Sequence, residues 1–205
     1  DCPNLIVNGD FEAGNVGFTS QYPFQNPIEP VSDTLMGNAG EGVYTVYSSA
    51  AAVHPVWSDI TDHSDGQLVL IVNGALTPNV LMWGQNVAVE KNTTYTFTYY
   101  LASSYPVSPA RLKCNINGVE IGTDTAPPSA ADGWLEVSYE WNSGDSELAQ
   151  ISLTNLNPER SGNDFVIDDI SFCSVDRADR DGDGVDDDDD LFPDDPKRAT
   201  IIDHI

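Results

Sequence analysis

The stretch "WLEVSYEW" at residues 134–141 decides the fold, because its apolar and polar side chains alternate without interruption. Every second residue from Leu135 to Trp141 is apolar, and Glu136, Ser138 and Glu140 lie between them. Successive side chains of a β-strand point to opposite faces, so this pattern predicts a strand with one buried and one solvated face. Six further segments are rich in β-branched and aromatic residues and predict more strands: 42–48, 68–73, 81–90, 94–102, 147–155 and 164–172.

The segment "CNINGVEIG" at residues 114–122 predicts a hairpin, because Asn117 and Gly118 both tolerate the positive φ that a tight turn needs. Just before the turn, Leu112, Cys114 and Ile116 share one strand face, so Cys114 is expected to be a small buried apolar residue. Helical periodicity is almost absent. Many short strands joined by turn-rich loops therefore predict an all-β protein, an antiparallel jelly-roll β-sandwich over residues 1–175.

The chain of 205 residues has a net charge of −25, which excludes some classes of partner. Residues 1–175 carry 21 acidic and 4 basic side chains (net −17), and residues 176–205 carry 12 and 4 (net −8). Nucleic acid is a poor partner for such a chain, and no apolar run is long enough to insert into a membrane. We find no nucleophile elbow, zinc-protease motif or phosphate loop, so we expect a protein that is not an enzyme.

The densest charge lies in "DRADRDGDGVDDDDDLFPDDP" at residues 176–196. With Asp179 at the first position of a twelve-residue loop, oxygen ligands recur at the spacing of a calcium loop and Gly184 occupies the turn position. The expected calcium ligands are Asp179, Asp181, Asp183, Val185 through its carbonyl, Asp187 and Asp190. Asp190 replaces the usual glutamate and no helical pattern flanks the loop, so an EF-hand is not expected. A solvated acidic linker is the alternative.

The same run resembles the thrombospondin type 3 repeat through the pattern D-x-D-x-D-G-x-x-D-x-x-D-x-x-P over residues 179–196. The resemblance implies an extracellular module without regular secondary structure, in which neighbouring acids hold further calcium ions. The additional ligands that it implies are Asp176, Asp188, Asp194 and Asp195. We therefore expect a small irregular calcium-loaded module at 176–198, followed by an apolar, β-prone tail at 199–205.

Residues 4–20 ("NLIVNGDFEAGNVGFTS") and 162–172 ("GNDFVIDDISF") resemble the first and last strands of galactose-binding-like jelly rolls, including carbohydrate-binding modules of families four, nine and twenty-two. The stretches 53–57, 62–75, 92–112 and 116–122 extend the resemblance to a bacterial surface subset of that fold. It implies a structural calcium where the two strands meet. Its ligands would be Glu12, then Asp168 or second Asp169, with Asp10 giving its carbonyl. Solvent-facing acids or acceptors in a turn are the alternative.

A sugar site needs an aromatic platform beside a few polar groups. Trp83 and Gln85 share one face of their predicted strand, and Trp57 and Tyr100 lie near strand ends, although a place in the core is the simpler interpretation for each ring alone. His54 and His63, with Asp59 and Asp62 nearby, could hold zinc, but a hydrogen bond that stabilises the loop is the simpler interpretation.

The cysteines and the chain ends bear on where the protein works. Chain ends of β-sandwiches often lie side by side, so a Cys2–Cys173 disulfide is expected. The beginning at Asp1 is what a processed secreted protein would show, and an arbitrary boundary would look the same. We expect a secreted, cell-surface binding or adhesion module for a glycan. The alternative is a structural subunit that assembles with copies of itself into a calcium-dependent filament through the tail.

Overall fold

The computed structural model describes residues 3–175, 191–192 and 197–198. The predicted calcium loop at 179–190, the further ligands Asp176, Asp188, Asp194 and Asp195, and the tail at 199–205 lie outside these residues. So does Cys2. The thrombospondin type 3 module, the tail-mediated filament and the domain boundary at 175/176 therefore stay predictions. None of the helices in the described ranges is long and apolar enough to cross a membrane.

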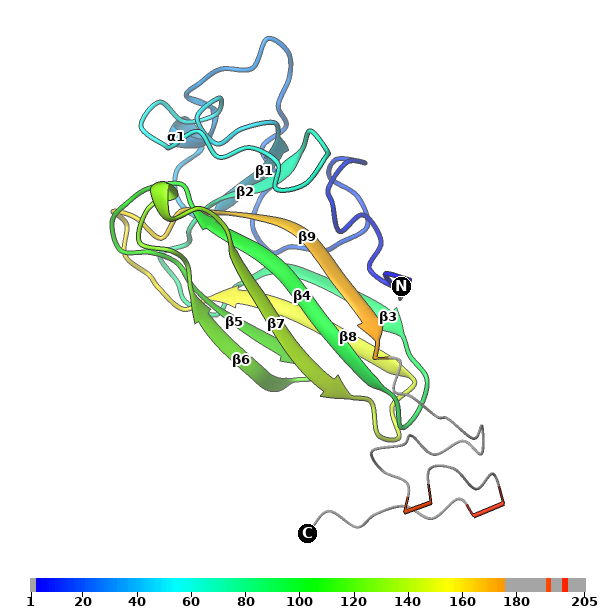
Figure 1. Cartoon of the computed structure of the whole chain (residues 1–205). Coiled ribbons are helices and arrows are strands. Elements are labelled where there is room, and N and C mark those ends of the chain that lie inside the picture. The colour runs from blue at the N-terminus through cyan, green and yellow to red at the C-terminus, as the bar shows by residue number, and fades with distance from the viewer. Residues whose placement is uncertain (1–2, 176–190, 193–196, 199–205) are drawn as a thin grey trace.

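The described residues form two antiparallel sheets that face each other (Figure 1). The five-stranded sheet has the order β1-β2-β9-β4-β7, and the four-stranded sheet has the order β3-β8-β5-β6. The strands are β1 (Val43–Tyr47), β2 (Val69–Asn73), β3 (Leu81–Ala88), β4 (Thr94–Ser103), β5 (Arg111–Ile116), β6 (Val119–Thr125), β7 (Leu135–Asn142), β8 (Leu148–Asn155) and β9 (Phe165–Ser174). The helical pieces are α1 (Leu35–Ala39) and a 3-10 turn, η1 (Ala130–Asp132). The predicted all-β jelly-roll class is confirmed.

The alternation of residues 134–141 is realised in β7. Val137 is buried, while Glu136 and Glu140 on the other face are exposed. The predicted hairpin is also present, because β5 pairs with β6 across a turn in which Asn117 has φ 52° and Gly118 has φ 79°. Both turn residues thus adopt the left-handed conformation that the Asn-Gly pair tolerates.

The main core lies between the two sheets. Its largest fully buried side chains include Trp83, Phe97, Tyr99, Phe165 and Phe172, and Cys114 is buried among them as predicted. Burying a side chain of this size stabilises the fold by roughly 1.5–3 kcal/mol relative to leaving it in water. The core therefore holds the sheets together and leaves their outer faces for other contacts.

A β-bulge interrupts β9 at its centre. Ile167 and Ile170 both point into the core, with two residues between them. In a regular strand only one residue separates neighbouring side chains on the same face. The register against β4 shifts between Thr98 and Tyr100, and Asp169 has φ 47°. Aspartate tolerates this conformation better than most residues. Because of the bulge, the side chains of Asp168 and Asp169, which are adjacent in sequence, can both lie toward the outer side of the five-stranded sheet.

A second apolar cluster covers part of the outer face of the five-stranded sheet. Met36 of α1, with Val53 and Trp57 from the following loops, packs against Ile71 and Val166. In Figure 1 these loops lie beside β1 and β2, away from the outer edge formed by β7. The rest of that outer face, on β4, β7 and the second half of β9, is therefore open to other uses.

Residues 4–20 do not form the strand that was expected, and this expectation was wrong. The Asn8 side chain binds the segment into a turn, since its Nδ2 donates to the carbonyls of Gly14 (2.9 Å) and Val16 (2.8 Å). Asn8 and Phe11 also have positive φ, which no strand allows.

The beginning of the segment nevertheless runs along β9, where Leu5 N donates to the Phe172 carbonyl (2.8 Å). That adjacency is what a Cys2–Cys173 disulfide would require. The disulfide itself stays a prediction, because Cys2 lies outside the described residues.

Candidate functional site

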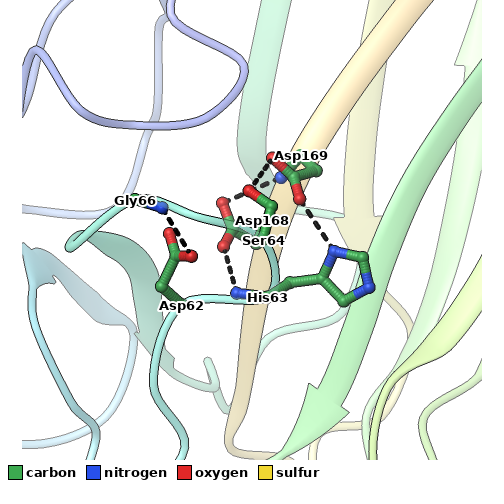
Figure 2. A network of polar contacts seen from close by, with 6 residues as sticks. All are labelled: Asp62, His63, Ser64, Gly66, Asp168 and Asp169. Atoms are coloured by element: carbon green, nitrogen blue, oxygen red, sulfur yellow. Dashed lines mark hydrogen bonds and ion pairs between the residues drawn. The ribbon is translucent and has the colours of Figure 1, made fainter.

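The bulge of β9 meets the loop at residues 62–68, and carboxylates gather at this junction (Figure 2). Asp168 is fully buried, and its carboxylate accepts hydrogen bonds from the backbone N–H of His63 (2.9 Å) and of Asp169 (2.8 Å). Asp62 accepts from the N–H of Gly66 (2.9 Å). The 62–68 loop is thus held by hydrogen bonds from its backbone N–H groups to carboxylate oxygens.

Glu12 reaches the same loop from the N-terminal segment. Its Oε1 accepts from the N–H groups of Gln67 (2.6 Å) and Leu68 (2.7 Å). A Cβ at Gly66 would overlap the Glu12 carboxylate and would lie 2.6 Å from Asp62 Oδ2. The carboxylates of Glu12 and Asp62 therefore approach a common point that only glycine leaves open.

The electrostatics of this junction are unfavourable as they stand. The pKa of Asp168 is raised to about 8, chiefly by burial and also by the charges of Asp169 and Asp62, although hydrogen bonds from the backbone N–H groups of His63 and Asp169 oppose the shift. Oδ2 of Asp62 is buried and finds no hydrogen-bond partner among the described residues. Buried carboxylates of this kind are costly unless a cation or a donor satisfies them.

The donor set suits a hard cation such as calcium, which takes carboxylate and backbone carbonyl oxygens. Within the described ranges no three or more His, Cys, Asp or Glu side chains lie close enough together to hold a metal ion by themselves. The unpartnered oxygen of Asp62 and the all-oxygen chemistry of Glu12, Asp62 and Asp168 nevertheless fit the ion that the sequence predicts. A calcium here would need backbone carbonyls to complete its coordination.

The structure sorts the predicted ligands of this site. Glu12 and Asp168 both accept hydrogen bonds from the 62–68 loop, Glu12 at its end and Asp168 at His63, and their role as calcium ligands stays a prediction. Asp169 instead binds His63, whose Nδ1 lies 2.7 Å from Asp169 Oδ2. Asp10 accepts weakly from the N–H of Glu12 (3.4 Å) and lines a neighbouring groove. Sequence reasoning named Asp62 only beside the two histidines, as a neighbour of a possible zinc site, and did not group it with Glu12 and Asp168, although "DHSDG" at 62–66 has the short polar residues of a loop that wraps around a carboxylate.

His63 links this junction to the open part of the sheet. Its ring stacks on Tyr100 with centroids 3.6 Å apart and planes at 20°, and Trp134 meets its edge at 5.6 Å. The hydrogen-bond interpretation of His63 is therefore the one that the structure supports. Asp169 orients the imidazole, and the imidazole in turn fixes the Tyr100 ring on the outer face of β4.

We name the hollow beside this ring the Tyr100 groove. It has a volume of about 580 Å³ and lies between the N-terminal segment and strands β4, β7 and β9. Its lining residues are Asn4, Ile6, Asn8, Gly9, Asp10, Thr98, Tyr100, Glu136, Asp169, Ile170 and Ser171. Tyr100 and Glu136 are register partners across β4 and β7, and their side chains hydrogen-bond to each other. An aromatic ring and a carboxylate thus share the groove.

The other predicted sugar-binding residues lie elsewhere. Trp83 is fully buried in the core beside Phe97, so the prediction that its ring forms a platform was wrong. The Gln85 side chain is also committed, because it donates to the carbonyls of Val7 (3.0 Å) and Gly17 (2.7 Å) and accepts from Val7 N (2.9 Å). Trp57 is buried in the second apolar cluster and borders a separate small pocket.

A second hollow, of about 610 Å³, lies on the outer face of the four-stranded sheet. Its polar groups are amides and hydroxyls such as those of Asn86, Gln150 and Ser152. Its one aromatic residue, Phe18, packs edge-on against Phe11 and into the core. Of the two larger hollows, the Tyr100 groove is therefore the one that presents a ring to a ligand.

Neither the protein-family profiles nor the curated proteins gave a match to this sequence. Solved structures did. TmCBM61 in complex with β-1,4-galactotriose matches with a TM-score of 0.54 and 12% identity, over 84% of this chain and 99% of that chain.

Two more structures resemble the chain at a TM-score of 0.50. A Family 16 Carbohydrate Binding Module-2 is 17% identical over 82% of this chain and 99% of its own. The CBM22-1–CBM22-2 tandem domain from Paenibacillus barcinonensis Xyn10C is 14% identical over 87% of this chain and 48% of its own. The chain thus has the two-sheet β-sandwich of carbohydrate-binding modules, and the likeness is one of fold.

Proposed function

We propose that this chain is a secreted, non-enzymatic carbohydrate-binding module that holds its glycan in the Tyr100 groove. The observation that carries the proposal is the half-buried ring of Tyr100, which His63 stacks against and which Glu136 hydrogen-bonds. Sugar sites combine an aromatic surface for the apolar face of a pyranose with a few polar groups for its hydroxyls. A fold shared with carbohydrate-binding modules supports the proposal without naming the sugar.

The polar groups of the groove divide into two sets. Asn4 is committed to structure, since its side chain donates to the Ile170 carbonyl (3.0 Å) and accepts from the N–H of Phe172 (2.9 Å). Within the described part of the chain, the carboxylates of Glu136 and Asp10 accept no hydrogen bond from a buried backbone group, since the one backbone donor to Asp10 is the exposed N–H of Glu12. These two acids are therefore our candidates for gripping sugar hydroxyls beside Tyr100.

Calcium enters the proposal as a structural ion. Glu12, Asp62 and Asp168 would hold it, and it would supply the positive charge that offsets these carboxylates. The chain's own residues do the rest, because Asp169 orients His63 and His63 stacks on Tyr100. Fixing the 62–68 loop therefore fixes the ring that the glycan would contact.

The test is a calorimetric titration of the full chain with β-1,4-galactotriose and a set of soluble polysaccharides. We expect saturable binding of at least one glycan, loss of that binding in Tyr100→Ala, and a weaker loss in Glu136→Gln. Tyr47→Ala is the matched control, because Tyr47 lies on β1 at the opposite edge of the same sheet. Unchanged affinity in Tyr100→Ala would exclude the groove, and a protein that binds no glycan would exclude the function.

A further inference from the structure

A small pocket of about 170 Å³ borders the second apolar cluster at Trp57, and we name it the Trp57 pocket. It is lined by Glu41, His54, Val56, Trp57, Asn73, Tyr105, Arg160, Ser161, Gly162 and Asp164. Pockets that enclose drug-sized ligands measure roughly 300–1,000 Å³. This one is therefore suited to a single chemical group with a few attached carbons.

Two carboxylates converge in the pocket. The Asp164 side chain is only 6% exposed, its Oδ1 accepts from Gly74 N (3.2 Å), and Trp57 also hydrogen-bonds to it. Glu41 is 19% exposed, and its Oε2 is buried without a hydrogen-bond partner in the described part of the chain. A buried acceptor without a donor is destabilising, so a ligand with N–H groups that reach this oxygen would be stabilised here.

The pocket has little positive charge of its own. Arg160 approaches Glu41 at 3.6 Å, but its side chain is 71% exposed, and an ion pair in such a position is weak. Burial lowers the pKa of His54, and its Nδ1 accepts a hydrogen bond from Val56 N (3.4 Å), so this imidazole is neutral. The two acids therefore face each other without a buried cation.

The aromatic walls narrow the choice of ligand. Trp57, stacked with His54 at 4.4 Å, and Tyr105 supply ring surface beside the carboxylates. A calcium ion would need six to eight oxygens, which rings do not provide. An anion would be repelled, and a neutral hydroxyl would leave the charge unbalanced. A cation of modest size gains both the carboxylates and the rings.

The walls are also held in place. Asn163 N donates to the Ser108 carbonyl (2.7 Å), and a Cβ at Gly162 would overlap the carbonyl oxygen of Val107. The loop that carries Arg160 is thus pressed against the loop that follows Tyr105. A pocket formed in advance spares the ligand the cost of ordering it.

We propose that the Trp57 pocket binds the primary ammonium group of a small amine, with Glu41 and Asp164 as its acceptors. Two sources present this chemistry, an amino sugar with a free amine and a lysine side chain. The site does not include Tyr100 or any residue of the groove, so it stands or falls independently of the glycan function proposed above.

The test follows the indole N–H signal of Trp57 by NMR of the full chain at about pH 7, close to the pKa of about 7 to which burial raises Asp164. The probes are glucosamine, Nα-acetyl-lysine amide, glucose and N-acetylglucosamine. We expect one or both amines to shift the signal saturably and the two neutral sugars to leave it unchanged, and the tighter amine identifies the source. Equal responses to glucosamine and glucose, or no response to either amine, would overturn the proposal.

Variants separate binding from folding. Glu41→Gln should weaken amine affinity by about tenfold or more, because it removes one charged acceptor. Glu159→Gln is the matched control, since Glu159 is exposed and does not line the pocket, and it should bind as the wild type does. Arg160→Gln should bind the amine at least as tightly as the wild type, because it removes a weakly competing cation without disturbing a buried group. A lower affinity in Arg160→Gln contradicts the proposal even if Glu41→Gln does not fold.

Discussion

The buried carboxyl of Asp164 should make the stability of the protein fall as pH rises through the weakly acidic range. Burial raises its pKa from 3.8 to about 7, and the charge of Glu41 adds to the shift, although bonds from Gly74 and Trp57 oppose it. In the unfolded chain this carboxyl ionises near its ordinary value. Between about pH 4 and pH 7 the folded state therefore holds a proton that the unfolded state has lost.

The sign and size of the effect follow from this difference. The contribution of Asp164 is fully present below about pH 4, and it is lost as pH rises through the folded pKa of about 7. A shift of about three units, at about 1.36 kcal/mol per unit, corresponds to roughly 4 kcal/mol. Asp164→Asn removes the ionisation, so its free energy of unfolding should lack this pH-dependent part. The variant also loses the Trp57 hydrogen bond, which costs about 1 kcal/mol at every pH.

The assay is urea denaturation of the wild type and of Asp164→Asn in steps of about one unit from about pH 4 to about pH 8. We expect the variant to gain roughly 4 kcal/mol relative to the wild type across this range. Asp145→Asn, which removes an exposed carboxylate, should keep the pH profile of the wild type. If the difference between Asp164→Asn and the wild type stays within about 1 kcal/mol at all pH values, Asp164 is not buried as described.

Three more predictions concern packing and the proposed ion. Gly122→Ala should destabilise the fold by about 1–3 kcal/mol in urea denaturation, because its Cβ would overlap the Tyr139 ring, and wild-type stability would contradict this contact. Leu153→Ala should cost about 2–5 kcal/mol in the same assay, since Leu153 is fully buried, and a loss under about 1 kcal/mol would place it outside the core. Calcium at about 100 times its dissociation constant should add about 2.7 kcal/mol to the wild type by calorimetry. Asp62→Asn should lose most of that gain and Asp65→Asn, on the same loop but exposed, should keep it; equal gains in both would remove Asp62 from the site.

The strands were predictable because their signal is local. In β7 the alternation of Val137 with Glu136 and Glu140 determines both the extended backbone and the buried face. The β5–β6 turn was equally accessible, since Asn117 and Gly118 need only their own conformational freedom. The fold class follows from such elements, because strands with one dry face have to pair with a second sheet.

Trp83 shows where that reasoning ends. It was grouped with Gln85 because the two share a face of their predicted strand. The Gln85 amide is bound to the backbone of Val7 and Gly17, which satisfies its polar groups within the protein. A side chain that bonds a distant backbone segment gives no local sign of it.

The candidate sites were partly predictable for the same reason. Glu12 and Asp168 could be paired only through a resemblance to known jelly rolls, and Asp62 joins them from a loop far from both in sequence. The irregular path of residues 4–20 depends on the side-chain bonds of Asn8, which override the β-prone composition of the segment. The Trp57 pocket assembles residues from five separate stretches of the chain, and no stretch alone indicates it.

The position of β9 in the sheet determines when this part of the chain can fold during its synthesis. The last strand of the described sandwich lies between β2 and β4 and bonds to both. Until it leaves the ribosome, both neighbours expose unpaired edges, so the five-stranded sheet closes only at the end of translation of this region. Sheet formation through strand pairs that are far apart in sequence is slow, and the intermediates that precede it are prone to aggregation. A nascent chain stalled before Phe165 would therefore be a substrate for chaperones or aggregation, whereas one released after Ser174 could fold.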